Sequence, residues 1–397
     1  MHEPQRHEPL RTIAWDAERA RQAIVEIVDD ATTAFDPRRF WLAHALDEQI
    51  ADGSPTLYWG ATGVIWGLDH LRRCGAVTTS RDFTPALAPL LAAHAAIAES
   101  YGSLAPYASL FMSDVAPLLL HLRLAPNAAV ADRLLARLRD NLGLPPLELM
   151  WGVAGSMLVA LAMAEPRGDA LYRELAAHLL GSLREAAEGP IWEQALYNNP
   201  PTCLFGLVHG AAGNLAALYR GWHLLDDAQR ERTRAATRVL VASAHEDVEG
   251  ANWPAGSQRW PIRGGAEGAL LLQQCHGAPG IVTACTPLPF PAPALERLLV
   301  RAGELIWHAG PHEKGANICH GTAGSGYAFL ALYRRTGDAR WLDRARAFAM
   351  HAIEQVDAAR DAFSQGRYSL WTGDVGTAIY LWDCITGEPR FPTLDVL

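Results

Sequence analysis

Two Cys-His-Gly tripeptides are the residues of this 397-residue chain best suited to chemistry. They are Cys275-His276-Gly277 and Cys319-His320-Gly321, and their cysteines lie 44 residues apart. Thiolate sulfur and imidazole nitrogen are the ligands that zinc prefers in proteins. One such pair would be a weak indication, because buried cysteines and core histidines are common. Two pairs at equivalent places in a repeated pattern predict a zinc site.

The residues alone leave two arrangements of this site open. All four side chains could close a structural Cys₂His₂ site, or three could bind and leave a position for an exchangeable ligand, as in catalytic zinc sites. An adjacent Cys and His reach the same metal only if the backbone turns sharply between them. Four ligands from two adjacent pairs therefore look strained.

A repeated glycine motif must position these residues, and such a repeat is identified before the chain is divided into domains. Two glycines three residues apart precede an apolar run six times, and a degenerate copy lacks both glycines. The copies begin at Gly60, Ser113 (the degenerate copy), Gly152, Gly210, Gly277, Gly321 and Gly373. Consecutive copies start 39 to 67 residues apart, which leaves room for two helices and their turns. Glycine at a helix start permits tight turns and close approach of backbones.

The two helices of each unit differ in character, as the unit at Gly321 shows. Residues 324–336 are apolar on nearly every face and stop at Gly337, which predicts a fully buried helix. Residues 341–356 place their apolar side chains on one stripe, which predicts an amphipathic helix outside the first. The β-branched alternation of strands is almost absent. The sequence therefore predicts an all-α fold, an α/α toroid with seven inner and seven outer helices.

Composition sets broader limits. We expect one domain over residues 1–397, with repeats from about 58 to 384 and an N-terminal helical segment over 1–50. The chain is 50% hydrophobic, enough for a large core, and its net charge of −9 argues against nucleic acid as a partner. It has no run of 18 apolar residues and no apolar segment near Met1, so we expect no membrane insertion and a cytoplasmic location. Six cysteines in such a chain favour metal binding or burial over disulfides.

With these motifs the chain resembles the lanthionine synthetase C-like family. Besides 275–280 and 318–321, the likeness lies in Glu148-Leu-Met-Trp-Gly152, Gly206-Leu-Val-His-Gly210, Asn252-Trp-Pro254 and Ser369-Leu-Trp-Thr-Gly373. The resemblance covers residues 58 to 384 in the family's order. It implies a toroid that holds Zn²⁺ through Cys275, Cys319 and His320 and adds a thiol to a dehydrated Ser or Thr. His276 would then lie beside the metal and steady the transition state.

Three further residues are candidates for the implied reaction, which needs a thiolate, a proton donor and stabilisation of an enolate. His209, in the repeat before Cys275, is the expected acid or stabiliser; otherwise it is a helix-start histidine bonded to backbone. Glu148 stands where similar cyclases carry a functional aspartate; otherwise it is a favourable first-turn charge. Lys314, the only lysine, stands where glutathione-adding relatives carry a lysine that meets substrate carboxylate; otherwise it is a solvated loop cation.

Two departures from the family pattern bear on the substrate. Gln274 stands where the family usually has Trp, and Leu271 replaces an arginine of dedicated cyclases. The missing arginine, with Lys314 present, favours addition of glutathione to a dehydrated peptide or protein over cyclisation of a peptide-internal cysteine. A cyclase would need a separate dehydratase as its partner.

Two other classes of function stay open at this stage. One is a scaffold that binds zinc, or zinc and glutathione, without turnover. The other is a glycosidase-like toroid, in which Glu148 and Asp374 would be the paired carboxylates. The glycosidase hypothesis leaves both Cys-His-Gly motifs unexplained.

Overall fold

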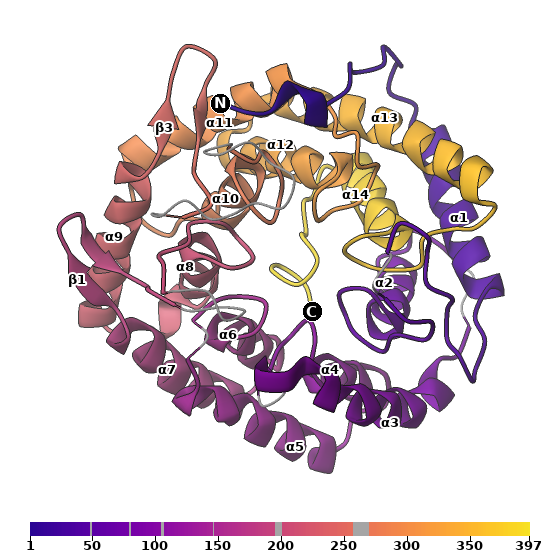
Figure 1. The fold of residues 1–397 in the computed structure, drawn as a ribbon, viewed down its shortest axis with the longest axis horizontal. Coiled ribbons are helices and arrows are strands. Elements are labelled where there is room, and N and C mark those ends of the chain that lie inside the picture. Colours follow the sequence, from indigo (N-terminus) through magenta and orange to yellow (C-terminus); the bar gives the residue numbers. More distant parts are fainter. Residues whose placement is uncertain (48–49, 79–80, 105–106, 146, 195–200, 257–269) are drawn as a thin grey trace.

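The computed structural model describes residues 1–47, 50–78, 81–104, 107–145, 147–194, 201–256 and 270–397. Fourteen α-helices lie in this part of the chain, and Figure 1 shows them as two concentric rings viewed down the axis. The predicted α/α toroid is confirmed. None of the helices within the described ranges is both long and apolar enough to cross a membrane.

The inner ring consists of the helix that follows each glycine motif. Its members are α2 (Ala61–Arg73), α4 (Val115–Leu124), α6 (Val153–Ala162), α8 (Ala211–Arg220), α10 (Ala278–Cys285), α12 (Thr322–Thr336) and α14 (Asp374–Thr386). They are largely buried on every side; residues 153–160 of α6, for example, are all buried. Helix α12 ends as predicted, because Gly337 follows it in the left-handed conformation (φ 71°).

The outer helices bury one stripe and expose the rest. They are α1 (Ala17–Thr33), α3 (Leu87–Ala98), α5 (Ala128–Arg139), α7 (Pro166–Gly181), α9 (Asp227–Ala242), α11 (Pro293–Ala309) and α13 (Ala339–Phe363). In α13 the predicted apolar stripe from Leu342 to Val356 is buried, whereas Arg340 and Asp343 are exposed. Helix α1 precedes the repeats and packs against α14, which closes the ring between the first and last units.

Short β-hairpins and 3₁₀ segments lie between the helices. Two antiparallel hairpins, β1 (Arg184–Ala186) with β2 (Gly189–Ile191) and β3 (His245–Glu246) with β4 (Ala251–Asn252), follow α7 and α9. A buried tryptophan after each hairpin, Trp192 or Trp253, donates its indole N–H at 2.8 Å to a backbone oxygen of the preceding helix. The 3₁₀ segments are Pro4–Arg6, Thr84–Ala86, Glu99–Leu104, Asp140–Gly143 and Trp222–Leu224.

A closed ring of hydrogen bonds joins the seven turns that lead into the inner helices. Each turn contributes the residue that stands two places before the first position of its motif. Hydrogen bonds connect this residue to the equivalent residue of the next turn. The backbone N–H→O links are Tyr58→Phe111, Met150→Val208, Val208→Cys275, Cys275→Cys319, Cys319→Trp371 and Trp371→Tyr58, at N···O distances between 2.9 and 3.5 Å. The Ser109 hydroxyl supplies the remaining link by donating to the Met150 oxygen. The ring gathers all seven turns at one end of the toroid and makes Cys275 and Cys319 neighbours in it.

The second glycine of a motif is required because each turn folds back onto the start of its helix. A Cβ at Gly324 would lie 2.3 Å from the Ile318 backbone oxygen, and one at Gly280 would lie 1.9 Å from that of Gln274. No side chain tolerates such distances from backbone. These glycines therefore serve packing, and the chemistry rests with the residues around them.

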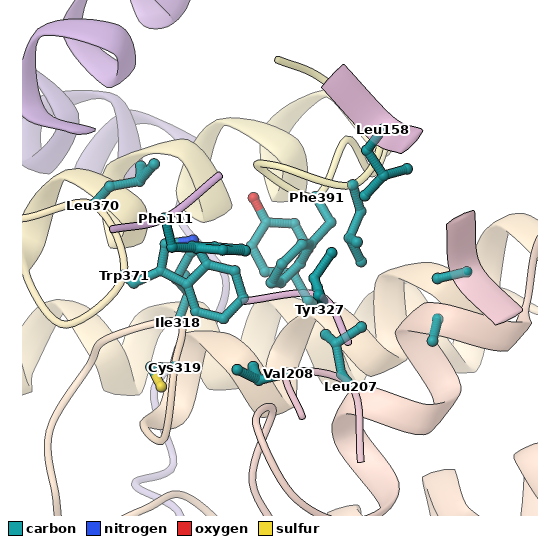
Figure 2. Packing of buried hydrophobic residues seen from close by; sticks show 14 of the residues in the cluster. Phe111, Leu158, Leu207, Val208, Ile318, Cys319, Tyr327, Leu370, Trp371 and Phe391 are labelled. Atoms are coloured by element: carbon teal, nitrogen blue, oxygen red, sulfur yellow. The ribbon is translucent and has the colours of Figure 1, made fainter. Parts of the chain in front are cut away.

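The C-terminal tail, which follows α14, lies inside the ring (Figure 1). Its Phe391 packs edge-to-face on Trp371 and Tyr327, with ring centroids 5.6 and 4.8 Å apart. Asp395 of the tail pairs with Arg220 of α8 at 2.6 Å. Figure 2 shows these aromatic side chains gathered with Phe111 in the middle of the core. The tail thus packs against inner helices from within the ring, and Phe391 joins the aromatic cluster next to the turn that carries Trp371.

Candidate functional site

Two thiols meet at the end of the toroid that carries the turns. The Cys275 N–H donates to the Cys319 backbone oxygen at 3.2 Å, and the two thiols are hydrogen-bonded to each other. Cys319 is buried and Cys275 is partly exposed. The hydrogen bond with Cys319 lowers the pKa of Cys275, whereas burial raises the pKa of Cys319. Because it is partly exposed, Cys275 is the thiol of the pair that a substrate can reach more easily.

Two polar side chains contact the sulfurs. The Tyr58 hydroxyl lies 2.6 Å from Cys319 Sγ, and Gln273 donates its Nε2 to Cys275 Sγ at 3.0 Å. Donors of this kind stabilise a thiolate away from bulk water. Neither residue stood out in the sequence. Tyr58 could have been found, because it stands two places before the first glycine of its motif, as both cysteines do.

His320 continues the chain from Cys319 at a sharp turn. The Asn317 side-chain oxygen accepts the N–H groups of Cys319 and His320 at 3.1 and 3.0 Å. Burial lowers the pKa of His320 to about 3, helped by the charges of Lys314 and Arg367, so the ring is neutral as a metal ligand must be. Within the described ranges, no three His, Cys, Asp or Glu side chains are arranged to hold a metal ion. The thiol pair is formed without His320, and the zinc site stays a prediction.

His276 turns toward the neighbouring repeat. Its ring centroid lies 5.9 Å from that of His209, and burial lowers the pKa of His276 to about 3. Its Nδ1 is buried and has no hydrogen-bond partner in the described part of the chain. A Cβ at Gly206 would lie 2.6 Å from the Cys275 oxygen and 3.3 Å from this Nδ1. Glycine at 206 thus lets the turn that carries His209 approach the Cys-His turn closely.

His209 is oriented by Glu148. The His209 Nδ1 lies 2.8 Å from Glu148 Oε2, and the carboxylate also accepts the N–H groups of Met150 (3.1 Å) and Trp151. Glu148 is fully buried. A carboxylate on Nδ1 fixes the tautomer and the orientation of an imidazole. Glu148 lies in the turn before α6 (Val153–Ala162), whose first turn holds no acidic residue, so it is not the first-turn charge of its alternative interpretation and orients His209 instead. The partner of the His209 Nδ1 is thus a carboxylate.

Two cations flank the thiol pair. The exposed Lys314 helps to lower the pKa of Cys275, and Arg367 has the same effect on Cys319, although burial dominates there. Arg367 is held by Asp47 through two hydrogen bonds, of 3.0 and 2.5 Å. Lys314 stood out in the sequence because it is the only lysine, whereas Arg367 did not, because arginine is abundant in this chain.

Asp374, the second carboxylate of the glycosidase hypothesis, lies at the first position of α14. It accepts the Arg367 N–H at 3.1 Å and pairs with Arg360 at 3.5 Å. Burial raises the pKa of Asp374 to about 6. Glu148 and Asp374 therefore each have partners of their own and serve different turns.

Known proteins resemble this chain in sequence. Among curated proteins the chain is similar to LanC-like protein GCL1 from Arabidopsis thaliana, 28% identical over 262 residues, which are 63% of this chain and 58% of that one. It is also similar to Glutathione S-transferase LANCL1 from Danio rerio, 33% identical over 138 residues, 32% of each chain. The chain thus matches less than two thirds of the length of either relative.

The fold is shared with a solved structure. Nisin cyclase superimposes with a TM-score of 0.62 over 92% of this chain and 93% of that one, at 14% sequence identity. The family described as lanthionine synthetase C-like protein has a sequence model that matches residues 20–396, nearly the whole chain. The chain therefore belongs to the lanthionine synthetase C-like family.

Proposed function

We propose that this chain is an enzyme that forms thioethers, by adding a cysteine-type thiol to the β-carbon of a dehydroalanine or dehydrobutyrine residue. The observation that carries the proposal is the thiol pair of Cys275 and Cys319 beside the oriented imidazole of His209. The relatives support this class of reaction, because one is named a cyclase and another a glutathione S-transferase.

The residues present fit zinc. Cys275 and Cys319 are already in contact, and His320, the next residue in the chain, carries a neutral imidazole. We propose these three as the ligands. The ring of His276 faces His209 instead, which favours the three-ligand site over the closed Cys₂His₂ site. Zinc, when bound, lowers the pKa of a coordinated thiol and so supplies a thiolate at neutral pH.

The protein's own groups handle the proton and the charge of the enolate. As the C–S bond forms, the electron pair of the double bond moves toward the carbonyl oxygen, and the α-carbon then takes a proton. We assign this proton to His209, which Glu148 holds in place through the 2.8 Å contact with its Nδ1. His276 lies next to His209 and, being neutral, offers an N–H to the enolate oxygen.

Glutathione is the thiol that the surrounding charges favour. The exposed Lys314 lies near enough to lower the pKa of Cys275, and glutathione carries carboxylates that such a cation binds. A cysteine within a peptide carries no carboxylate near its sulfur. We therefore infer that free glutathione is the preferred thiol and that a dehydrated peptide or protein is the acceptor. If the chain is a cyclase instead, a separate dehydratase must supply its substrate.

The proposal is tested with zinc-loaded protein and a peptide that contains one dehydroalanine. Mass spectrometry should detect the glutathione adduct, formed faster than without enzyme. A second peptide, with a dehydroalanine and an internal cysteine, should cyclise more slowly. If the zinc-loaded protein accelerates neither reaction, the chain is a binding scaffold rather than an enzyme.

A further inference from the structure

Tyr58 occupies, in the first repeat, the position that Cys275 and Cys319 occupy in later repeats. Its backbone belongs to the hydrogen-bonded ring, because its oxygen accepts the Trp371 N–H at 3.2 Å. Its side chain is 7% exposed, and its hydroxyl lies 2.6 Å from Cys319 Sγ. The ring of turns thus places three side chains of equivalent position around one point: two thiols and a phenol.

The hydrogen of the Tyr58–Cys319 contact can belong to either residue while the thiol is protonated. A cysteine that binds a metal is a thiolate and has no hydrogen to give. In the zinc-bound protein Tyr58 must therefore be the donor. Hydrogen bonds to an ionised acceptor are about twice as strong as neutral ones. The Tyr58–Cys319 hydrogen bond therefore becomes stronger when the site binds zinc.

An aromatic stack holds the Tyr58 ring in this place. The ring stacks on the Trp371 indole, with centroids 5.6 Å apart and planes at 23°. Phe111 and Phe391 each contact Trp371 edge-to-face, at 5.0 and 5.6 Å. Trp371 and Phe391 are almost fully buried, at 0% and 1% exposed. Figure 2 shows the Trp371–Phe391 part of this stack, with Cys319 at its edge.

We propose that Tyr58 is a positioning residue of the zinc site. Its hydroxyl donates to the Cys319 thiolate and fixes the direction of that sulfur, and Trp371 with Phe391 keeps the phenol from turning away. The inference rests on the proposed zinc function and adds a residue to it. It also gives the C-terminal tail an indirect part in the site, because Phe391 belongs to that tail.

The variant Tyr58→Phe keeps the ring and its stacking and removes only the hydroxyl. We expect its zinc affinity, measured by competition with a chromogenic chelator, to fall about 10- to 100-fold, as for other groups that hold metal ligands in place. In Co²⁺-substituted protein the sulfur-to-cobalt charge-transfer band should move to longer wavelength, because the sulfur has lost a hydrogen bond. Neither readout depends on turnover.

Tyr172→Phe is the matched control. It removes a buried hydroxyl that donates to the Ala217 oxygen at 3.0 Å between α7 and α8, and both readouts should stay at wild-type values. Wild-type zinc affinity and an unshifted cobalt band in Tyr58→Phe would overturn the inference. The proposed function would survive that result as long as the wild-type protein binds zinc and forms thioethers. A wild-type protein that binds no zinc would overturn both.

A second pair of variants tests the part of the tail. Phe391→Ala leaves Tyr58 in place and removes the ring that contacts Trp371, so zinc affinity should fall in the same direction by a smaller factor. Phe348→Ala opens a comparable cavity under the outer helix α13 and should leave zinc affinity unchanged at a temperature where the protein is folded. Equal zinc affinities in the two variants would overturn the role of the tail.

Discussion

His209 Nδ1 donates to Glu148 Oε2 across 2.8 Å and so joins two turns whose residues are 61 positions apart in the chain. The carboxylate is buried and also accepts backbone N–H groups of its own turn, so the imidazole has one favoured orientation. A group that delivers a proton to carbon needs such fixed geometry, because general acid catalysis depends on reach before it depends on pKa.

The first prediction concerns this pair. His209→Asn should slow thioether formation by about 10² to 10⁴, the usual contribution of one general acid or base. Zinc content should not change, because His209 is not among the proposed ligands. Glu148→Gln should cause a smaller loss, since the amide oxygen still accepts a hydrogen bond from His209 but carries no charge. The measurement is kcat/KM with a dehydroalanine peptide and glutathione.

The double variant provides the control for this prediction. If Glu148 acts through His209, the combination His209→Asn with Glu148→Gln should be about as slow as His209→Asn alone, because residues that act as a unit are not additive. Losses that multiply would show that Glu148 has a separate role, such as holding the turn before α6.

The second prediction tests which thiol is used. Lys314→Ala should weaken glutathione use by about 1–3 kcal/mol, the range for losing a charge-assisted hydrogen bond. Cyclisation of a peptide-internal cysteine should change far less, and comparing two thiols on one enzyme cancels damage to the fold. Lys314→Arg keeps the charge and should recover most of the loss. Equal losses for both thiols would assign Lys314 to the enolate or to the fold.

The third prediction concerns the motif glycines. Gly324→Ala places a methyl group 2.3 Å from the Ile318 oxygen and should cost about 1–3 kcal/mol of stability, as overpacking does. Gly181→Ala, at the end of α7, meets nothing within 4 Å and should be neutral or slightly stabilising. Thermal melting of the two variants checks the difference. A Gly324→Ala protein as stable as the wild type would show that the turn can shift.

The fourth prediction is that the stability of the protein depends on pH through His70, which lies in the last turn of α2. Burial lowers the pKa of His70 to about 4, with Arg123 and Arg390 acting the same way and Asp69 opposing them. The folded state thus favours neutral His70, so its contribution is complete above pH 6.5 and is lost as the pH falls from 6.5 through about 4. The loss amounts to about 3 kcal/mol at most.

The variant His70→Gln cannot titrate and should lose less stability between pH 7 and pH 4 than the wild type. Urea unfolding at both pH values measures this, and the comparison cancels the contribution of other acidic groups. Parallel pH profiles in the two proteins would mean that His70 titrates normally in the folded state.

Much of the fold could be predicted from the sequence because its signals are local. The spacing of Gly321 and Gly324, the all-apolar run after them and the stop at Gly337 define an inner helix without knowledge of the rest. Seven such units must close on themselves to bury their apolar faces. The hairpins after α7 and α9 were not predicted, because pairs of two or three residues leave little periodicity to detect.

The site was harder to predict, because its contacts cross between repeats. The types of Cys275 and Cys319 suggest chemistry by themselves, whereas the importance of Tyr58, Gln273 and Arg367 arises only from what lies next to them. The ring of hydrogen bonds makes equivalent positions of different repeats neighbours. An alignment of the seven turns would therefore have revealed Tyr58, but not Gln273, which approaches its cysteine from within the same turn.

The proposed zinc site is tested best by the metal content and coordination of the purified protein. We predict about one zinc ion per chain, and X-ray absorption should show two sulfurs, one nitrogen and an exchangeable ligand. Cys319→Ala should abolish binding while the toroid, held by its apolar core, still folds. A closed site with both His276 and His320 bound, or a folded protein without affinity for zinc, would contradict the three-ligand zinc site proposed for this chain.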